Sequence, residues 1–223
     1  MRIKGFIFDF DGTVLETESP EYDVWQEIYQ EYGGRLTMDD WSQAVGGPPE
    51  MFDVIGHLEN QVGHTLDRES IMARRHRRIM EITRDQDALP GVRDYLETAK
   101  RLGIKLCIAS CSDRPWIVEH LDRLGLTSTF EHILSMEDVQ HLKPDPELYL
   151  LALQRMGLEA SEVVVFEDSH NGVAAAKCAG IYVVNVVNSI TRHRNGKEAD
   201  LVVDSLAEIP PLQLLEQLEH PGS

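Results

Sequence analysis

Acidic residues directly follow two short apolar segments. Their spacing suits catalysis on a negatively charged substrate group. Asp9 and Asp11 come directly after the apolar segment 3–8, and Glu167 and Asp168 follow a second such segment. Carboxylate oxygens are the ligands that hard divalent cations such as Mg²⁺ prefer in proteins. A carboxylate beside such a cation can also attack as a nucleophile or exchange protons. These residue types therefore predict metal-assisted chemistry, and phosphoryl transfer is the reaction that they fit best.

Two further side chains offer groups for phosphoryl oxygens. Ser110 follows the apolar segment 105–109, and Lys143 begins a turn that contains two prolines. A phosphate ester repels an anionic nucleophile, so a hydroxyl donor and a fixed ammonium lower the barrier by neutralising charge. The backbone N–H groups of Gly12 and Cys111 would add donors, and glycine lets the chain turn sharply beside a ligand. We expect Gly12, Ser110, Cys111 and Lys143 to contact the phosphoryl group.

The roles of the carboxylates follow from their spacing. Asp9 is the expected nucleophile and would carry an aspartyl phosphate. Asp11 lies two residues further on, where it can give a proton to the leaving oxygen and later take one from water. We expect Asp9, Asp11 (through a backbone carbonyl) and Asp168 to hold Mg²⁺. Glu167 is expected outside the direct ligands, where it would orient metal-bound water.

Each of these residues has a simpler alternative role. Asp-Gly is itself a turn signal, and Ser110 can cap a helix without taking part in chemistry. Lys143 can be a surface lysine before a turn, and Ser112 and Asp113 fit helix capping better than catalysis. The joint occurrence of four polar strand ends favours the site over these alternatives.

The segments around these residues alternate between apolar strands and amphipathic helices. This pattern predicts an α/β fold with a doubly wound parallel sheet, covered by helices on both faces. In such sheets ligands bind beyond the carboxyl ends of the strands, which is where the candidate residues lie. The expected strands are 3–8, 105–109, 131–135, 163–166, 182–187 and 200–203. The expected helices between them are 92–102, 116–124, 146–156 and 173–179.

Residues 15–88 interrupt this alternation. The segment has no strand-like apolar run but carries helical patterns at 21–32, 49–62 and 68–83. We interpret it as a small all-helical cap domain inserted after the first strand, with residues 1–14 and 89–223 forming the catalytic core. Two connections near 15–19 and 84–89 would then act as a hinge.

Glycines and a proline mark the expected helix ends. A glycine follows each of four helical patterns, where a left-handed residue commonly ends a helix. These glycines are Gly103, Gly125, Gly157 and Gly180. Asp145 and Pro146 are expected as the N-cap and first residue of the next helix.

Composition limits the class of protein. The 223 residues are 42% hydrophobic and 26% charged, with a formal charge of −17, which disfavours nucleic acid as a main partner. No segment reaches the length of a membrane span, and the N-terminal apolar run is shorter than a signal peptide needs. We expect a cytoplasmic protein, a monomer or weak homodimer, that binds a small phosphorylated substrate and neither nucleic acid nor membrane.

The motifs, taken in order, resemble the four signature motifs of the haloacid dehalogenase-like hydrolase superfamily. The helical insert is similar to the cap of the subfamily that contains β-phosphoglucomutase and small sugar-phosphate or phosphoglycolate phosphatases. This resemblance implies a Rossmann-like core, Mg²⁺, a phospho-aspartate intermediate and a cap that closes over the substrate. The matching residues are Asp9-Phe10-Asp11-Gly12-Thr13, Ser110, Lys143-Pro144-Asp145-Pro146 and Glu167-Asp168-Ser169-His170-Asn171-Gly172.

The second aspartate of the first motif bears on the type of chemistry. Relatives that open carbon–halogen bonds lack this pair of aspartates, and those that cleave phosphonates place a small residue where Asp11 stands. The resemblance therefore implies transfer from a phosphate ester, in a phosphatase or a mutase.

The cap is expected to select the substrate. Residues 74–78 carry four arginines, which form either a solvated face paired with acids or, through Arg78 or Arg75, a contact with an anionic substrate group. Residues 46–49 would be a specificity loop by family analogy, or simply a turn before the next helix. Trp25 is expected in the core of the cap, with a substrate platform as the alternative.

Three departures from the family pattern bear on the choice between phosphatase and mutase. β-Phosphoglucomutase-like sequences carry histidine, arginine and lysine where this chain has Glu21, the loop 46–50 and Arg78. A mutase must bind phosphate at both ends of a sugar, so we expect a phosphomonoesterase acting on a small metabolite, first of all a sugar phosphate. The alternatives are a phosphosugar mutase and, from another class, a phospho-accepting receiver module, which would be about half as long and lack the insert.

Replacing the expected nucleophile tests the covalent mechanism. Asp9→Asn should abolish turnover while preserving the fold, because the isosteric amide is a poor nucleophile. Steady-state phosphate release and circular dichroism would measure the two effects. Retention of more than about a thousandth of the activity would contradict covalent catalysis.

Overall fold

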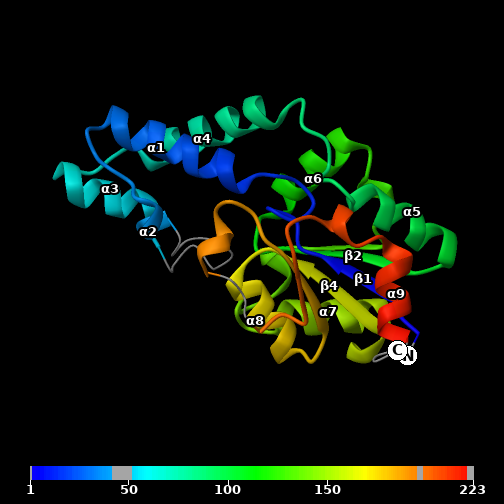
Figure 1. Ribbon diagram of the computed structural model, residues 1–223. Coiled ribbons are helices and arrows are strands. Elements are labelled where there is room, and N and C mark those ends of the chain that lie inside the picture. Colours follow the sequence, from blue (N-terminus) through cyan, green and yellow to red (C-terminus); the bar gives the residue numbers. More distant parts are fainter. Residues whose placement is uncertain (1, 42–51, 195–197, 220–223) are drawn as a thin grey trace.

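The computed structural model describes residues 2–41, 52–194 and 198–219 (Figure 1). In this part of the chain six strands form one sheet in the order β3-β2-β1-β4-β5-β6, and every neighbouring pair is parallel. The parallel sheet that the sequence predicts is therefore confirmed. The strands are β1 Gly5–Phe8, β2 Lys105–Ala109, β3 His132–Leu134, β4 Val163–Glu167, β5 Tyr182–Val186 and β6 Leu201–Val203.

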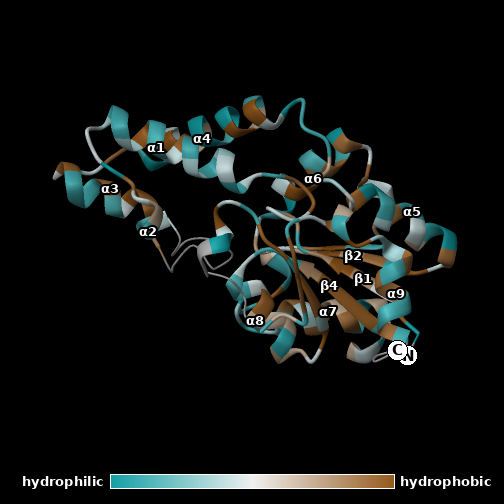
Figure 2. Cartoon of the chain, in the orientation of Figure 1, coloured by the Kyte–Doolittle hydropathy of each residue, from teal (hydrophilic) through white to brown (hydrophobic). Residues whose placement is uncertain are grey.

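Alternating side chains of each strand pack on opposite faces of the sheet. Phe6 and Phe8 contribute to one hydrophobic core, whereas Ile7 between them contributes to the other. Phe166 of β4 stacks on Phe8 with ring centroids 4.6 Å apart and meets the ring of Phe6 edge-on. Because both faces are covered, the strands are mostly apolar, as the hydropathy colours show (Figure 2). Lys105, Asn185 and Glu167 are polar exceptions.

Helices cover both faces of the sheet. The helices α5 Val92–Leu102, α6 Arg114–Leu124 and α9 Pro211–Glu219 supply residues to the core that contains Phe6 and Phe8. The helices α7 Glu147–Met156 and α8 His170–Cys178 supply residues to the core that contains Ile7. Short 3₁₀ turns lie at Thr127–Thr129, Met136–Asp138, Ala160–Glu162, Thr191–Arg194 and Leu206–Glu208.

The helical insertion between β1 and α5 consists of α1 Glu18–Glu31, α2 Met38–Trp41, α3 Val54–Val62 and α4 Arg68–Thr83. Helices α1 and α4 lie side by side, away from the sheet (Figure 1). The sequence predicts α4 correctly, whereas α2 is not expected from it. The predicted helix 49–62 begins at Val54 in the structure, and residues 49–51 lie outside the described part, as does the expected specificity loop 46–49.

Three helices begin before the residue that the sequence predicts, because a proline or glycine in the first turn hides their start. Pro20 lies within the first turn of α1 and Pro115 within that of α6. The missing N–H of proline costs little there, since the first N–H groups of a helix have no partner within it. Helix α8 begins at His170 rather than 173, and Ser169 caps it by accepting a hydrogen bond from Gly172 N at 3.0 Å.

The four glycines expected after helices have positive φ angles, between 64° and 75°. At the start of α7 the expected capping residue is one position off. Pro146 occupies the N-cap position, and the Asp145 side chain still accepts a hydrogen bond, from Glu147 N at 2.9 Å.

Two connections join the insertion to the sheet, and they touch one another. Leu89 N donates a hydrogen bond to Val14 O at 2.8 Å. Arg123 of α6 donates to the carbonyl of Gln86 at 2.6 Å and so holds the second connection against the core. This adjacency supports our proposed division into core and cap at residues 14/15 and 88/89. None of the helices in the described residues is long and apolar enough to cross a membrane.

Gly91, which precedes α5, tests how tightly this junction is packed. Its φ is +90°, and a Cβ there would lie 2.4 Å from Ala207 N and from the Leu206 carbonyl carbon. Gly91→Ala should therefore lower the free energy of unfolding by about 3 kcal/mol or more, because backbone strain adds to steric overlap.

Gly103→Ala is the matched control, because Gly103 also has a positive φ but no atom within 4 Å of its Cβ position. It should cost about 1 kcal/mol in urea unfolding. Equal losses would contradict the described contact.

Candidate active site

The carboxyl ends of three adjacent strands bring the predicted site residues together. Asp9 follows β1 and Ser110 follows β2, while Glu167 ends β4. Strand β1 lies between β2 and β4. From β1 the strand order runs outward through β2 and β3 on one side, and through β4, β5 and β6 on the other. This is the topological switch point at which parallel α/β sheets bind ligands. Asp9, Ser110 and Asp168 are buried there.

Lys143 lies at the centre of a buried charge cluster that also contains Asp9 and Glu167. Its Nζ donates to Asp9 Oδ1 at 2.5 Å, to Glu167 Oε1 at 2.6 Å and to the carbonyl of Ala109 at 2.9 Å. Burial by itself would lower the pKa of the ammonium, but the two carboxylates hold the pKa of Lys143 well above its ordinary value. Lys143 is therefore a fixed positive charge, and its side chain is only 1% exposed.

Glu167 is fully occupied by hydrogen bonds. Its Oε1 accepts from Lys143 and from the hydroxyl of Tyr149 at 2.9 Å. Its Oε2 accepts from the backbone N–H and the hydroxyl of Ser169, at 2.9 and 3.0 Å. These donors hold the carboxylate in one orientation, in which it positions Lys143 against Asp9.

A third carboxylate completes a group that could hold a metal ion. Asp9, Glu167 and Asp168 each offer an oxygen within 4.8 Å of the others. Burial and the neighbouring carboxylates raise the pKa of Asp9 and of Asp168 well above the ordinary value. An all-oxygen donor set with excess negative charge fits a hard divalent cation. Because Glu167 is already saturated, Asp9 and Asp168 are better placed as direct ligands.

Asp168 is held in place by residues on both sides. Asn188, in the loop after β5, donates from Nδ2 to Asp168 Oδ2 at 2.7 Å. On the other side Gly12 approaches so closely that a Cβ there would lie 2.3 Å from Asp168 Oδ2. With a φ of +73° as well, position 12 requires glycine for both conformation and space.

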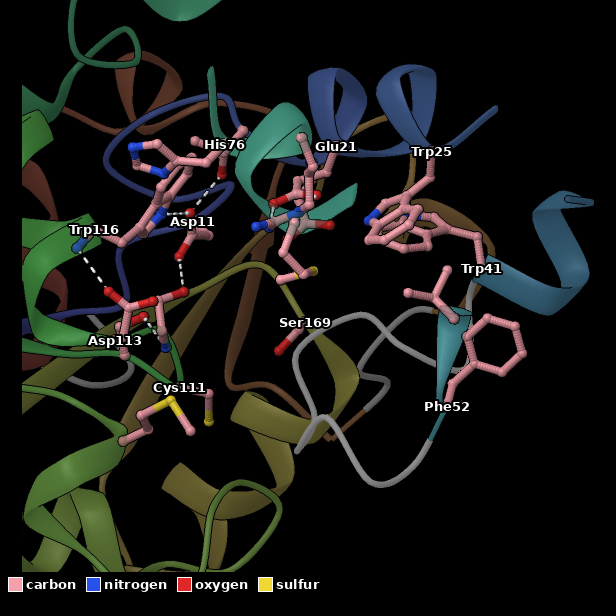
Figure 3. A pocket seen from close by; sticks show the side chains of 18 of the residues that line it. Asp11, Glu21, Trp25, Trp41, Phe52, His76, Cys111, Asp113, Trp116 and Ser169 are labelled. Atoms are coloured by element: carbon pink, nitrogen blue, oxygen red, sulfur yellow. Dashed lines mark hydrogen bonds and ion pairs between the residues drawn. The ribbon is translucent and has the colours of Figure 1, made fainter. Parts of the chain in front are cut away.

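The Asp11 carboxylate is not part of this three-carboxylate group. Its Oδ1 accepts from Thr17 Oγ1 at 2.7 Å and from Trp116 Nε1 at 2.9 Å, and its Oδ2 accepts from Ser112 Oγ at 2.5 Å (Figure 3). If Asp11 contributes to a metal site, it does so through its backbone, as the sequence analysis expects. The side chain remains beside the cavity, where it can exchange protons.

Ser110 and Cys111 line the cavity beside Asp9. The hydroxyl of Ser110 accepts from Ser112 N at 3.0 Å, which leaves its own proton for a ligand. Burial raises the pKa of the Cys111 thiol to about 11, so it is neutral near pH 7 and a poor nucleophile. Asp113 caps α6 as predicted, accepting from Trp116 N at 2.8 Å.

A cavity of about 510 Å³ extends from these residues to the helical insertion. Arg75, Glu21 and Trp25 line it, and Trp25 is also buried among the insertion's apolar residues. Arg78 does not line it. Its side chain is exposed and pairs with Glu27 and Glu81, both at 3.3 Å. Of the two arginines expected to contact substrate, Arg75 faces the cavity and Arg78 does not.

Several residues that touch the site are absent from the sequence prediction. Tyr149, Thr17 and Trp116 reach it from α7, from the start of α1 and from α6. Asn188 follows the end of β5 by two residues, so its position beyond a strand end is a usable signal. For Trp116 the sequence offers no such signal, because its contact with Asp11 depends on how α6 packs.

Comparisons with known proteins bear on the class. A model of the family described as haloacid dehalogenase-like hydrolase matches residues 6–186. YhcW of Bacillus subtilis (strain 168) is 41% identical, over 97% of this chain and 98% of its own length. The phosphorylated carbohydrates phosphatase of Thermotoga maritima is 32% identical, over 98% of this chain and 99% of its own. A solved structure of a CbbY variant from Rhodobacter sphaeroides, in complex with xylulose 1,5-bisphosphate, is 26% identical with a TM-score of 0.73. It covers 93% of this chain and 96% of that one.

The chain belongs to the haloacid dehalogenase-like hydrolase family, as its four motifs predict. The expected α/β core with a helical insertion is confirmed along with this assignment, and so is the expectation of a hydrolase-family enzyme. The alternative of a receiver module is wrong, because the family match runs from β1 to the end of β5 and includes the helical insertion.

The proposed metal ligands predict a pH-dependent stabilisation by Mg²⁺. Binding to the folded state alone should raise the melting temperature by about 5 °C or more when free Mg²⁺ is about 100 times its Kd. Because burial raises the pKa of Asp9 and Asp168, the metal-free fold retains protons there to higher pH, and the cation must displace them. The shift should therefore be larger near about pH 8 than near about pH 5.5.

Thermal melts of Asp168→Asn should show most of this shift lost. Asp23→Asn removes the same charge from an exposed position on α1 and serves as the control. A full shift in the Asp168 variant would contradict the assignment of this carboxylate as a ligand.

Proposed function

We propose that this protein is a Mg²⁺-dependent phosphatase that hydrolyses a small phosphorylated metabolite through an aspartyl phosphate at Asp9. The observation that carries the proposal is the buried contact of Asp9 with Lys143, next to Asp168 and at the floor of a cavity. A nucleophilic carboxylate must meet a phosphoryl group that is itself negative. The ammonium and a divalent cation remove that repulsion, which is the main requirement of this reaction.

The first step is attack of an Asp9 oxygen on phosphorus. The P–O bond to the leaving group breaks, and protonated Asp11 gives its proton to the leaving oxygen. When bound, Mg²⁺ would neutralise charge on the phosphoryl oxygens, held by Asp9, Asp168 and a backbone carbonyl near Asp11. Ser110 donates to a phosphoryl oxygen, aided by the N–H group of Cys111. The N–H group of Gly12, which the sequence predicts as a further donor, instead donates to the carbonyl of Leu15 at 2.8 Å.

In the second step water attacks the phosphorus of the aspartyl phosphate. Asp11, now a carboxylate, takes a proton from that water, and the bond between phosphorus and the Asp9 oxygen breaks. Inorganic phosphate leaves and the Asp9 carboxylate is restored. Thr17, Ser112 and Trp116 donate hydrogen bonds to Asp11 from separate segments and hold its carboxylate over the cavity, where it can accept this proton.

A phosphorylated sugar is the substrate class that the comparisons support. One relative is named for phosphorylated carbohydrates, and one structural neighbour binds a pentulose bisphosphate. In this chain the cavity beyond Asp9 carries polar and aromatic side chains together, including Glu21, Arg75 and Trp25. Hydroxyl groups and the C–H faces of a sugar fit such a lining.

Turnover of p-nitrophenyl phosphate in Mg²⁺ tests the activity, and a panel of phosphorylated metabolites identifies the substrate. We expect phosphate release that disappears when the metal is chelated. No turnover, together with a long-lived phosphoprotein, would contradict the phosphatase.

The mutase alternative calls for a separate assay. The protein is incubated with β-glucose 1-phosphate and a trace of β-glucose 1,6-bisphosphate. Glucose 6-phosphate that accumulates without free phosphate would favour the mutase over the phosphatase.

A further inference from the structure

Glu21 of α1 and Arg75 of α4 form an ion pair that faces the cavity. Arg75 Nε donates to Glu21 Oε2 at 2.8 Å, and its Nη2 contacts the other carboxylate oxygen. The guanidinium lies over the indole of Trp116, 5.8 Å from the ring centroid. Figure 3 shows Glu21 between Asp11 and Trp25, on the side of the cavity away from Cys111. The pair is therefore placed to contact the leaving group, which is the part of the substrate beyond the phosphoryl group.

The other basic side chains of the cavity are also committed to carboxylates. Lys143 is bound by Asp9 and Glu167, and Arg68 is bound by Asp53 and Glu59. In the described part of the chain, the cavity is lined by three Lys or Arg side chains against seven Asp or Glu. The segment 42–51 contains no Lys or Arg in its sequence. Beyond the phosphoryl site, these described residues leave no positive charge free for a second phosphate.

Because acidic side chains outnumber basic ones in the cavity, an uncharged leaving group should bind better than one that carries a second phosphate. A second phosphate would meet the Glu21 carboxylate and Arg75 at once, and would have to compete with Glu21 for the guanidinium. An uncharged polyol needs only donors and acceptors. Arg75 has five N–H donors, and those not used by Glu21 can donate to hydroxyls, while Glu21 can accept from them. Trp25 and Trp116 also line the cavity and add apolar surface on either side of Glu21 (Figure 3).

We propose that Glu21 and Arg75 act together as the specificity pair of this pocket, binding hydroxyl groups of a monophosphorylated, otherwise uncharged substrate and disfavouring bisphosphates. The inference rests on the proposed phosphatase function and narrows its substrate class. It also disfavours a mutase, whose cycle requires a bisphosphate in the same cavity.

Competitive inhibition of p-nitrophenyl phosphate hydrolysis tests the pair. Fructose 6-phosphate and fructose 1,6-bisphosphate are the two probes, and the readout is the ratio of the bisphosphate Ki to the monophosphate Ki. We expect this ratio to exceed unity in the wild-type protein. Glu21→Gln should lower it by about tenfold, because Arg75 keeps its charge without a partner in a partly desolvated site. Arg75→Gln should raise the ratio, because the Glu21 carboxylate then stands alone.

Glu27→Gln is the matched control. Glu27 also lies on α1 and pairs with an arginine of α4, Arg78, but on the exposed side and outside the cavity. The same loss of one negative charge should leave the Ki ratio within about twofold of the wild type, since exposed pairs are screened by solvent. Circular dichroism melts confirm that each variant is folded, and if Glu21→Gln does not fold, Arg75→Gln carries the test.

The outcomes separate the two proposals. A wild-type protein that does not hydrolyse p-nitrophenyl phosphate with Mg²⁺ contradicts the phosphatase function and this inference with it. Hydrolysis with a Ki ratio that neither Glu21→Gln nor Arg75→Gln changes contradicts the specificity pair alone. A ratio that moves equally in Glu27→Gln contradicts it too, since the effect would then come from overall charge.

Discussion

The burial of Lys143 between Asp9 and Glu167 is the constraint on which the site depends. A buried charge is tolerated only when opposite charges and hydrogen bonds replace the water it has lost. Here the Nζ of Lys143 donates hydrogen bonds to Asp9, to Glu167 and to the carbonyl of Ala109. Glu167 also accepts hydrogen bonds from Tyr149 and Ser169, which hold it in place. Removing Lys143 would leave two buried carboxylates without the positive charge that they share. The strand order follows the same need, because β1 must lie between β2 and β4 for these groups to meet.

The two parts of the chain contribute differently to the reaction. The core supplies Asp9 and Asp168 from strand ends and Lys143 from the turn before α7, all in buried positions, so the phosphoryl site is formed before the substrate arrives. Asp11 is different, since one of its donors is Thr17, at the entrance to α1, and another is Trp116, which touches Arg75 and His76 of α4. The proton-transferring carboxylate thus contacts both the core and the insertion. Substrate held by Glu21 and Arg75 would lie within reach of it.

Most of the fold could be predicted from the sequence because buried parallel strands are apolar along their length and helices end at glycine. The site was predictable where it lies on strand ends, as Asp9, Ser110 and Asp168 do. It was not predictable where side chains come from helix faces. Arg75 and Arg78 are one helical turn apart, and only the packing of α4 on α1 decides which one faces the cavity. Trp116 and Tyr149 reach the site through similar packing.

The sequence places the starts of α1, α6 and α8 too late for a local reason. Proline and glycine usually mark breaks, yet in a first turn they cost little, because the N–H groups there bond outside the helix. Pro20, Pro115 and Gly172 all lie in such first turns. Each is read as a break in the sequence, so the predicted helix begins after it.

The most direct test of the account is to find the phosphoryl group on the protein during turnover. Rapid quenching of the enzyme with substrate and Mg²⁺, followed by borohydride reduction and peptide mass spectrometry, reports which carboxyl group was phosphorylated. The account predicts modification at Asp9, formed within one turnover and lost as free phosphate appears. Turnover with an unmodified Asp9, or with the phosphoryl group on another residue, would contradict it.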